Sequence, residues 1–561
     1  MNIQFVPKLF SIIKDGYTKK QFSGDLQAGI IVGIIALPLA IAFAIASGVP
    51  PEKGLITAII AGFVIAVLGG SRVNVSGPTG AFIVIVYGIV QKYGVDGLII
   101  STFIAGVMLM IMGFARLGSV IKFIPHPLVV GFTSGIAILI FSSQVKDLFG
   151  LKMGTVPADF VEKWIMYFKN FTSINPWAIG IAVATMLLSI YFKKITTKIP
   201  GSLIAVIVST MLVQFFHLPV ETIETKFGSI PSSLPLPMIP HITFAVIQQL
   251  IVPAFTIAML GAIESLLSAV VSDGMINGNH RSNMELIAQG AGNIFSSFFG
   301  GIPATGAIAR TAANIKNGGR TPVAAIVHAI VLLIIMLFIG KWAKLIPLSC
   351  LAGILAVVAY NMSEWRSFIS VVRGPRTDVA ILLTTFFLTV IIDLTVALEI
   401  GMILAAFLFM HKMSEVTNIQ IIDPHEEDDD SPNVLPNDID MSLPKGILIY
   451  EINGPLFFGV AHKFKDALVE TRSMPKVLII RMRNVSTIDA TGTHYFKEMI
   501  KEVQSQNTKV ILSGISPQIL NNLKDERILF MVGKNNIFNA FSDALMHGKQ
   551  ILNQESKKDE L

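Results

Sequence analysis

Two short polar breaks with nearly the same sequence interrupt a strongly apolar chain. Residues 78–81 have the sequence PTGA and residues 303–307 have the sequence PATGA, and each break precedes a short apolar segment. Proline and glycine interrupt membrane helices where the irregular backbone lines a cavity. The amides of a new helix start lack intrahelical acceptors and carry about half a positive charge, so they can hold an anion. Two such starts facing each other would cradle one, although Gly and Pro can also merely kink packed helices.

Arg310 lies one to two turns into the apolar segment that follows the second break. A charge there costs at least ~2.5–3.5 kcal/mol if it faces lipid, and a polar cavity that receives an anion lowers that cost. An arginine that anchors a short helix at the membrane surface is the alternative role.

Glu264 is a second ionisable residue in an apolar setting, in the middle of the segment AMLGAIESLLSAVVSDGM. Ser268 follows four residues later and therefore lies on the same helix face. An intramembrane carboxyl group is a functional-site hypothesis by default, and this one could load and release a proton. A structural pairing with Arg310 is the alternative. Asp393 and Glu399 flank an expected turn and are better explained as solvated helix ends.

The composition indicates a membrane protein. Of 561 residues, 53% are hydrophobic and 14% are charged, with a formal net charge of +6 and a mean hydropathy of +0.68. A soluble domain has about a quarter charged residues. The lone Cys350 excludes an intrachain disulfide, and the modest positive charge is better explained by inside-facing loops than by nucleic-acid binding.

Fourteen apolar spans can be placed along the first three quarters of the chain, each approaching the length needed to cross a bilayer. They are expected at 27–47, 55–69, 78–92, 97–116, 127–145, 175–192, 201–216, 243–272, 284–300, 304–316, 321–340, 347–361, 378–394 and 396–412. The two breaks lie about half of this region apart, which is typical of transporters built from two inverted repeats with broken helices near the membrane midplane.

Basic residues predict the orientation. Those that fall in connections on one side are Arg116, Lys122, Lys193, Lys194, Lys198, Arg281, Lys316, Arg320, Arg366, Arg373 and Arg376. By the positive-inside rule this side is cytoplasmic, and an even number of spans returns the C-terminus to it. The mixed-charge loop 146–169 is an exception. Residues 1–24 are expected to be a cytoplasmic segment on the membrane surface, without a cleavage site.

The remaining chain has the pattern of a soluble domain. An acidic linker is expected at 416–440, where residues 423–440 have the sequence DPHEEDDDSPNVLPNDID. KGILIYEI, KVLIIRM and TKVILSG are predicted strands, and AHKFKDALVETR and HYFKEMIKEVQSQ are predicted amphipathic helices. Alternating strands and helices indicate one small α/β domain over 441–555, followed by a tail, 556–561.

Several segments together resemble the SulP family of anion permeases from about residue 25 to the C-terminus. VSGPTGAF, LGAIESLLSAVVSDGM, NMELIAQGAGNIFSSFFGGIPATGAIARTAANI and NMSEW are similar to its third, eighth, ninth-to-tenth and twelfth spans. The resemblance implies a polytopic α-helical transport domain over 25–415, with fourteen spans in two inverted repeats of seven that form a core and a gate. It also implies a cytoplasmic STAS domain and a homodimer.

The resemblance also implies the site. The anion would lie between the starts of spans three and ten and near the family's anion-attracting arginine: Gly77, Pro78, Thr79, Gly80, Ala81, Ala304, Thr305, Gly306, Ala307 and Arg310. Glu264 and Ser268 would serve the coupling ion. Sodium-coupled bicarbonate carriers have aspartate where this chain has Glu264, which favours protons over sodium.

In the STAS region, STIDATGTHYF resembles the loop that carries a phosphorylated serine in anti-sigma-factor antagonists. Ala490 occupies that place, with Thr491 and Thr493 nearby, so a structural or partner-binding role is favoured over phosphorylation.

The expectation is therefore a secondary active carrier in the inner membrane that takes up sulfate or a similar inorganic or carboxylate anion, with H⁺ and alternatively Na⁺. No enzyme motif, metal-ligand spacing or cofactor site is apparent. Bicarbonate and C4-dicarboxylates suit the predicted site almost as well as sulfate. An anion channel and a signalling protein that acts through its STAS domain are the alternatives of other classes, and nucleobase permeases share the transport fold by analogy.

Overall fold

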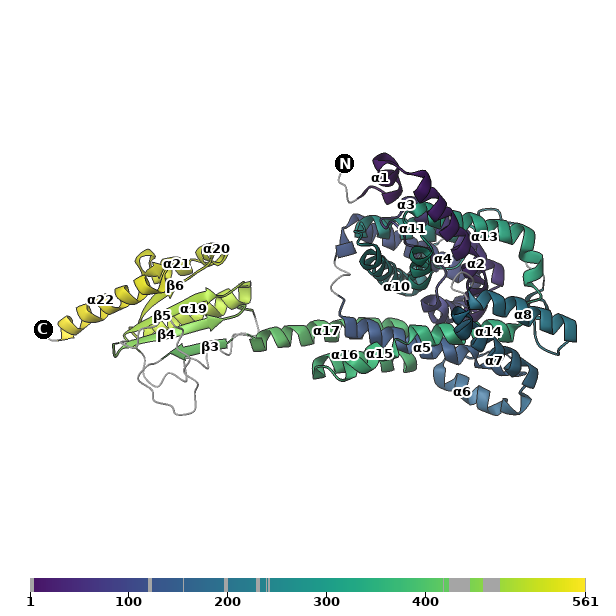
Figure 1. Ribbon diagram of the computed structural model, residues 1–561. Coiled ribbons are helices and arrows are strands. Elements are labelled where there is room, and N and C mark those ends of the chain that lie inside the picture. Colours follow the sequence, from purple (N-terminus) through teal and green to yellow (C-terminus); the bar gives the residue numbers. More distant parts are fainter. Residues whose placement is uncertain are drawn as a thin grey trace. The chain divides into compact units, whose positions relative to one another are not determined.

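The chain divides into two compact units, residues 1–403 and 404–561, in a computed structural model (Figure 1). The structure describes residues 5–119, 124–154, 156–195, 200–228, 233–238, 240, 243–416, 418–422, 444–457 and 475–559. Lys122, Lys198, the acidic stretch 423–440 and the expected helix AHKFKDALVETR lie outside the described residues.

The first half of the first unit holds seven helical segments, which match the first seven expected spans. They are α2 (Lys19–Ala46), α3 (Pro51–Leu68), the two parts of α4 (Ile83–Phe114), α5 (His126–Phe149), α7 (Pro176–Tyr191) and α8 (Gly201–Phe216). Helix α4 counts twice because its backbone leaves the helical region at Gly94, with φ 71°. Shorter helices are α1 (Lys8–Asp15), α6 (Phe160–Lys169) and α9 (Ile223–Phe227).

The second half holds seven more, at the places of the other seven expected spans. They are α10 (Phe244–Ile276), α11 (Ser282–Phe298), α12 (Ile308–Lys316), α13 (Pro322–Ala343), α14 (Leu348–Met362), α16 (Arg376–Ile391) and α17 (Leu394–Val416), of which α17 continues into the second unit. The short α15 (Trp365–Val372) precedes α16. Within the described residues, seven helices are long and apolar enough to cross a bilayer, and shorter apolar helices lie between them.

Short extended segments interrupt both halves at the same place. Strand β1 (Ser76–Gly77) precedes the third segment of the first half, and β2 (Thr305–Gly306) precedes the third segment of the second half. The breaks at PTGA and PATGA are therefore interruptions of helix, as the sequence predicted.

Local signals explain where some helices begin. Helix α2 begins at Lys19, well before the expected residue 27, because Thr18 and Gln21 form a reciprocal capping box. Helix α13 begins at Pro322, and the side chain of Thr321 accepts a hydrogen bond from the Val323 amide.

The helices of the first unit pack in two groups. Helices α2, α3 and α4 contact α10, α11 and α13, whereas α5 and α7 contact α14, α16 and α8. Glycines allow the closest approach in the first group, since a Cβ atom on Gly290 of α11 would lie 2.5 Å from the Gly106 carbonyl oxygen of α4. Small residues at such crossings are typical of membrane helices.

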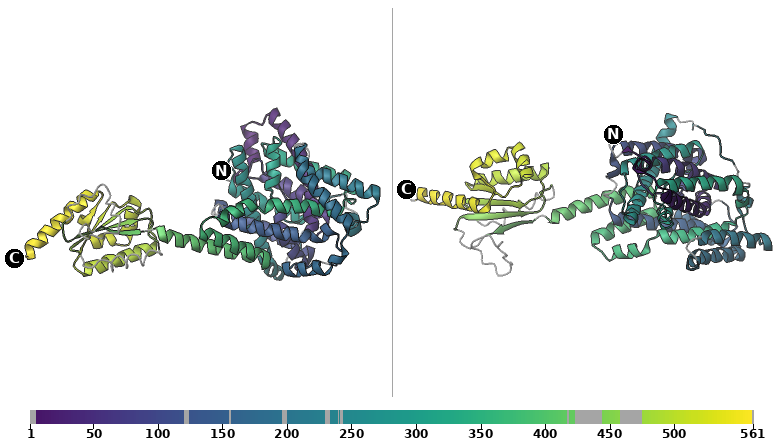
Figure 2. Two further views of the ribbon diagram at one scale, coloured as in Figure 1. Left: turned by 60° about the horizontal axis from the view of Figure 1, so that its bottom comes forward. Right: turned by 45° about the horizontal axis from the view of Figure 1, so that its top comes forward.

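The second unit is built on a sheet, which is visible in both views of Figure 2. Among the described residues its strand order is β3-β4-β5-β6-β7. The strands are β3 (Asn418–Ile422), β4 (Ile447–Asn453), β5 (Val477–Asn484), β6 (Lys509–Ser513) and β7 (Ile537–Phe538). Strand β3 is antiparallel to β4, and the other neighbours are parallel. The helices are α19 (Ala490–Ser505), α20 (Pro517–Asp525), α21 (Ile528–Val532) and α22 (Phe541–Asp559).

Both faces of this sheet are covered, as expected of parallel strands that are almost continuously apolar. Leu448 and Tyr450 of β4 share a core with Phe496 of α19. Ile449, which points to the opposite face, shares a second core with Ala544 of α22.

The three predicted strands and the helix HYFKEMIKEVQSQ are confirmed. Strand β3 was not predicted. It lies inside the stretch 416–440 that the sequence analysis assigned to the linker, so the sheet begins earlier in the chain than the expected residue 441. The apolar residues within 418–422 pack onto β4. The acidic composition of the neighbouring residues makes this strand hard to recognise in the sequence.

Candidate anion site at two facing helix starts

The two breaks meet in the interior of the first unit. Ser76 pairs with Gly306 and Gly77 pairs with Thr305 in an antiparallel bridge between segments more than 220 residues apart. The Ala307 amide also donates a hydrogen bond of 2.9 Å to the Val75 carbonyl. This bridge sets the starts of α4 and α12 beside each other, and all the residues expected at the two breaks are buried.

Both paired glycines lie close against polar side chains. A Cβ atom on Gly77 would lie 2.6 Å from Nη1 of Arg310, and one on Gly306 would lie 2.7 Å from Nδ2 of Asn74. Each break therefore touches a polar side chain that comes from the other half of the repeat. The glycines that the sequence analysis assigned to helix breaking also make this close packing possible.

The helix starts present amides that a ligand could use. The short 3-10 turn Gly80–Phe82 leads into α4, and α12 begins at Ile308. In the described chain, no hydrogen bond to another element is recorded from the amides of Gly80, Ala81 or Ile308. First-turn amides have no intrahelical acceptor and carry the positive end of the helix dipole.

Arg310 points across the bridge from α12. Its side chain is buried, with 3% exposure, and its Nη2 atom donates a hydrogen bond to the Pro78 carbonyl. No carboxylate lies within ion-pair distance of it in the described part of the chain. Arg310 is therefore a buried cation at the two helix starts, and the alternative of a surface anchor is wrong.

Apolar side chains from three other helices surround the first helix start. The space next to the Gly80 Cα is bounded by Met362 of α14, Ile140 of α5 and Phe43 of α2. The hydroxyl oxygen of Thr79 is buried there and has no hydrogen-bond partner within the described ranges. No sequence signal marks these three residues, because they are ordinary apolar residues of their own helices.

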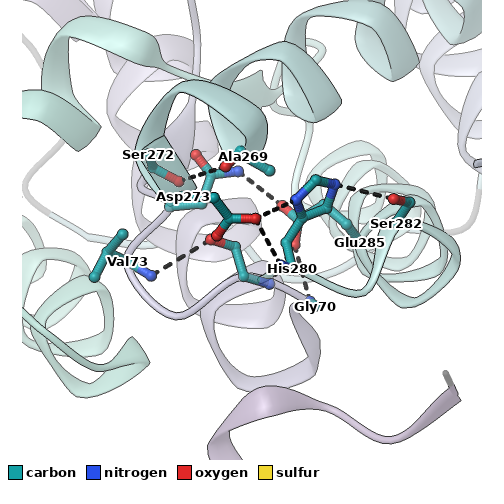
Figure 3. A network of polar contacts seen from close by, with 10 residues as sticks. Gly70, Val73, Ala269, Ser272, Asp273, His280, Ser282 and Glu285 are labelled. Atoms are coloured by element: carbon teal, nitrogen blue, oxygen red, sulfur yellow. Dashed lines mark hydrogen bonds and ion pairs between the residues drawn. The ribbon is translucent and has the colours of Figure 1, made fainter. Parts of the chain in front are cut away.

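A buried carboxylate that the sequence analysis did not single out fixes the first break. Oε2 of Glu285 accepts hydrogen bonds from the amides of Gly70 and Ser71 at 2.9 and 3.0 Å, and the bond to Gly70 is visible in Figure 3. Oε1 accepts from Asn74 Nδ2 at 2.8 Å and from Gln289 Nε2 at 3.2 Å. Glu285 thus attaches the connection before β1 to α11.

Asn74 extends this network to the second half of the repeat. Its Oδ1 atom accepts from the hydroxyls of Ser268 at 2.7 Å and Thr311 at 2.9 Å. Ser268, expected as a coupling-ion ligand, therefore contacts the first break through Asn74. The hydroxyl hydrogen of Ser268 is used in this bond, and the lone pairs of its oxygen remain available to a cation.

Asn293 of α11 fixes the second break in the same manner. Its Nδ2 donates to the Ala304 carbonyl at 2.9 Å, and its Oδ1 accepts from the Ala304 amide at 2.8 Å. Ser265 of α10 adds a 2.7 Å hydrogen bond to the Thr305 hydroxyl and accepts from the Gly306 amide at 3.2 Å. The backbone at both breaks is thus held by side chains of the neighbouring helices, α10 and α11.

Glu264 lies on α10, one residue before Ser265, and is half-buried. No hydrogen bond or ion pair of its carboxylate is recorded in the described chain, and the carboxylate of Glu364 lies within electrostatic range. Arg310 is not its ion-pair partner, so the alternative of a structural Glu264–Arg310 pair is wrong.

A separate polar cluster closes the connection between α10 and α11 (Figure 3). Oδ2 of Asp273 lies 2.7 Å from both the amide and Nδ1 of His280, and Nε2 of His280 lies 3.0 Å from the Ser282 hydroxyl. The neighbouring Arg281 donates to the Val6 carbonyl at 2.6 Å. The cluster therefore also holds the N-terminal segment.

No group of three or more potential metal-ligating side chains occurs among the described residues. The arrangement as a whole offers dipoles, the guanidinium of Arg310 and the carboxylates of Glu264 and Glu285 around two buried helix starts.

Comparisons with known proteins agree on one family. Residues 22–385 match the Sulfate permease family and residues 438–544 match the STAS domain. The chain is 40% identical to the "Putative sulfate transporter YvdB" of Bacillus subtilis (strain 168), covering 93% of this chain and 97% of that protein. It is 29% identical to the "Bicarbonate transporter BicA" of Picosynechococcus sp., covering 94% of each.

Solved structures have the same fold. The murine Solute Carrier 26 family member A9 anion transporter in the inward-facing state aligns with a TM-score of 0.86 at 20% identity, covering 97% of this chain and 94% of that chain. The transmembrane domain of a cyanobacterial bicarbonate transporter BicA aligns with a TM-score of 0.61 at 28% identity, over 70% of this chain and 98% of that chain. With its two paired helix breaks and its C-terminal STAS domain, this chain belongs to the sulfate permease family of anion transporters.

Proposed function

We propose that this protein is a secondary active transporter that takes up sulfate or a similar inorganic or carboxylate anion together with a proton. The anion binds between the starts of α4 and α12 and is exposed to each side of the membrane in turn. The observation that carries the proposal is the β1–β2 bridge, which brings together two buried helix starts and the guanidinium of Arg310. This guanidinium has no ion-pair partner among the described residues. Helix N-termini attract anions, and a buried arginine adds a full charge.

The residues proposed to hold the anion are those of the two breaks and the arginine beside them. Thr79, Gly80 and Ala81 supply the first helix start, with Gly77 and Pro78 before it. Ala304, Thr305, Gly306 and Ala307 lead into the second. Arg310 donates one hydrogen bond to the Pro78 carbonyl. Its other N–H groups remain available to an oxyanion.

Glu264 is the proposed proton carrier. It is near the second break, half-buried and without a recorded partner in the described chain, so its protonation would change the local charge directly. Moving a divalent anion inward against 100 mV costs roughly 4.6 kcal/mol, and one proton taken up with it offsets about half of that cost. Ser268 lies one turn away and supports the same site.

The test is uptake into proteoliposomes that contain the purified protein. Sulfate, bicarbonate, succinate and fumarate are offered in turn, with proton and sodium gradients imposed separately. A proton gradient should drive accumulation of at least one anion, and Glu264→Gln should abolish that dependence. Accumulation in the Glu264→Gln variant that still follows the proton gradient would refute the coupling role. Flux that follows voltage alone would identify a channel instead.

Sodium-coupled bicarbonate uptake is the second candidate, and the similarity to the "Bicarbonate transporter BicA" over nearly the whole chain favours bicarbonate as the anion. Glu264 in place of the aspartate expected of sodium-coupled members supports protons. Bicarbonate accumulation driven by sodium at constant pH would decide for this candidate.

We also propose that both termini are cytoplasmic and that the membrane is the inner membrane. Arg281 contacts the N-terminal segment, and the Arg320 amide donates to Asp25 near the start of α2. These contacts place basic connections at the end of the helices where the chain begins. The positive-inside rule assigns that end to the cytoplasm.

The STAS domain is proposed to bind a cytoplasmic partner or to stabilise a homodimer. At the start of α19, the Asp489 side chain accepts a hydrogen bond of 2.6 Å from the Gly492 amide. Thr493 is buried and donates to the Asp489 carbonyl at 2.7 Å. Ala490 and Thr491 are exposed, so Thr491 is the hydroxyl there that a partner could reach.

A further inference from the structure

A cavity with three lysines lies at the end of the helices away from the N-terminal segment. Its volume is about 330 Å³, and Lys146, Lys163 and Lys226 line it. Ala46, the last residue of α2, also lines it. Because α2 has 28 residues and rises 1.5 Å per residue, this cavity lies about 40 Å from the helix start near the basic connections.

Lys163 is the unusual member of this group. Its side chain is 5% exposed, and no hydrogen bond or ion pair of its ammonium group is recorded in the described chain. Its Nζ atom lies 5.9 Å from the centre of the Tyr87 ring, and burial lowers the pKa of the Lys163 ammonium below its usual value. The ammonium nitrogen itself is not among the buried polar atoms that lack a partner, and the carboxylate of Asp159 lies within electrostatic range of it. The charged end of Lys163 is therefore accessible from the cavity, while its stem is buried.

The other two lysines are only partly neutralised. Lys146 donates to the carbonyls of Met153 and Gly154 at 2.9 and 3.0 Å, which leaves one of its three hydrogens free. Lys226 lies 3.7 Å from Asp147. Asp147 is the acid that lines the cavity within the described residues, so the lining carries three positive charges and one negative charge.

The cavity also has polar groups that suit an oxyanion. Gln91 of α4 and Ser143 and Gln144 of α5 line it together with the lysines. Its wall is shared by α2 and α4, which pack with the group that contains both helix breaks, and by α5, which packs with the other group. A water molecule needs about 10–15 Å³ of such volume, so a small anion fits with part of its hydration shell.

We propose that this cavity is a second anion-binding site, where a small inorganic oxyanion or halide binds before it reaches the two helix starts. The ammonium of Lys163 is its main ligand, and Lys146 and Lys226 add charge. This inference rests on the proposed function for its role in transport, but the binding itself does not require transport.

The first experiment measures binding by the full-length protein with the central arginine removed. Thermal unfolding of the Arg310→Ala variant is followed while gluconate is replaced by sulfate, bicarbonate or chloride at constant ionic strength. A ligand that binds only the native state raises the unfolding temperature in a saturable way. At least one of the three anions should do so, and adding Lys163→Met should abolish the shift.

Two further variants separate binding from folding. Lys163→Met keeps the length and the apolar stem of the side chain, so packing against Tyr87 is preserved. Lys226→Gln changes a partly exposed side chain at the same cavity and should weaken the shift. Lys169→Gln is the matched control, because Lys169 is exposed on the same helix α6 and does not line the cavity.

The second experiment measures initial uptake rates in intact cells. Lys163→Met should raise KM for the transported anion roughly tenfold or more at unchanged maximal rate, because the anion loses the charge-assisted hydrogen bond of its main ligand. Lys169→Gln should leave KM unchanged. A fall in maximal rate with unchanged KM would mean that Lys163 is structural and would overturn the proposal.

The two proposals can fail separately. If no tested anion is accumulated but Lys163→Met abolishes a saturable thermal shift, the cavity binds anions and the proposed function is wrong. If accumulation occurs but none of the three anions gives a shift that depends on Lys163, the cavity proposal is wrong.

Discussion

Removing the carboxylate of Glu285 should destabilise the membrane unit strongly, although Glu285 is not proposed to touch the anion. In Glu285→Ala, the amides of Gly70 and Ser71 and Nδ2 of Asn74 lose the acceptor that the structure gives them. Each buried donor left unpaired costs about 1–3 kcal/mol, so the three together should cost roughly 3–9 kcal/mol. Glu285→Gln keeps one acceptor oxygen and should lose about half of that.

The assay is the fraction of protein that remains monodisperse after heating in detergent, measured by size exclusion. The expected order of stability is wild type, then Glu285→Gln, then Glu285→Ala. Glu399→Gln is the matched control, because Glu399 is exposed and has no recorded hydrogen bond in the described chain, so it should behave as wild type. If Glu285→Ala were as stable as Glu399→Gln, water would already satisfy these donors, and the network would not hold the first break.

Two glycine substitutions test the close contacts on which the site depends. In Gly77→Ala the new methyl group would lie 2.6 Å from Nη1 of Arg310, so the guanidinium must move. KM for the transported anion should then rise about tenfold or more. An unchanged KM would show that this contact does not position Arg310. In Gly290→Ala the methyl group would lie 2.5 Å from the Gly106 carbonyl, and separating α11 from α4 should cost about 1–3 kcal/mol in thermal stability. Gly180→Ala is the control, because the Cβ position of Gly180 has open space around it, and its thermal stability should be unchanged. Equal losses of stability in Gly290→Ala and Gly180→Ala would contradict the packing argument.

The positions of the helices and of the breaks could be predicted from the sequence, because they depend on local composition. Long apolar runs specify spans, and Pro78 and Pro303 with the following glycines specify interruptions. The place of Arg310 could be inferred for the same reason, since a charge in an apolar segment needs a polar environment.

The network that holds the breaks could not be predicted in this way. Glu285 bonds to backbone amides more than 210 residues earlier, and no local pattern indicates which buried carboxylate accepts them. The wall residues Phe43, Ile140 and Met362 come from three helices, and only the fold brings them together. Lys163 lies in the mixed-charge loop 146–169, which is an exception to the positive-inside pattern. Its burial depends on the packing of α6.

The anion position itself is the most direct test of the account. Crystals of the full-length protein grown with selenate, and measured at the selenium absorption edge, would locate a bound oxyanion by its anomalous signal. The account predicts a peak between the Gly80 and Ile308 amides, beside Arg310, and its loss in Arg310→Ala. If the protein takes up selenate but its crystals show no peak at the two helix starts, this account is contradicted.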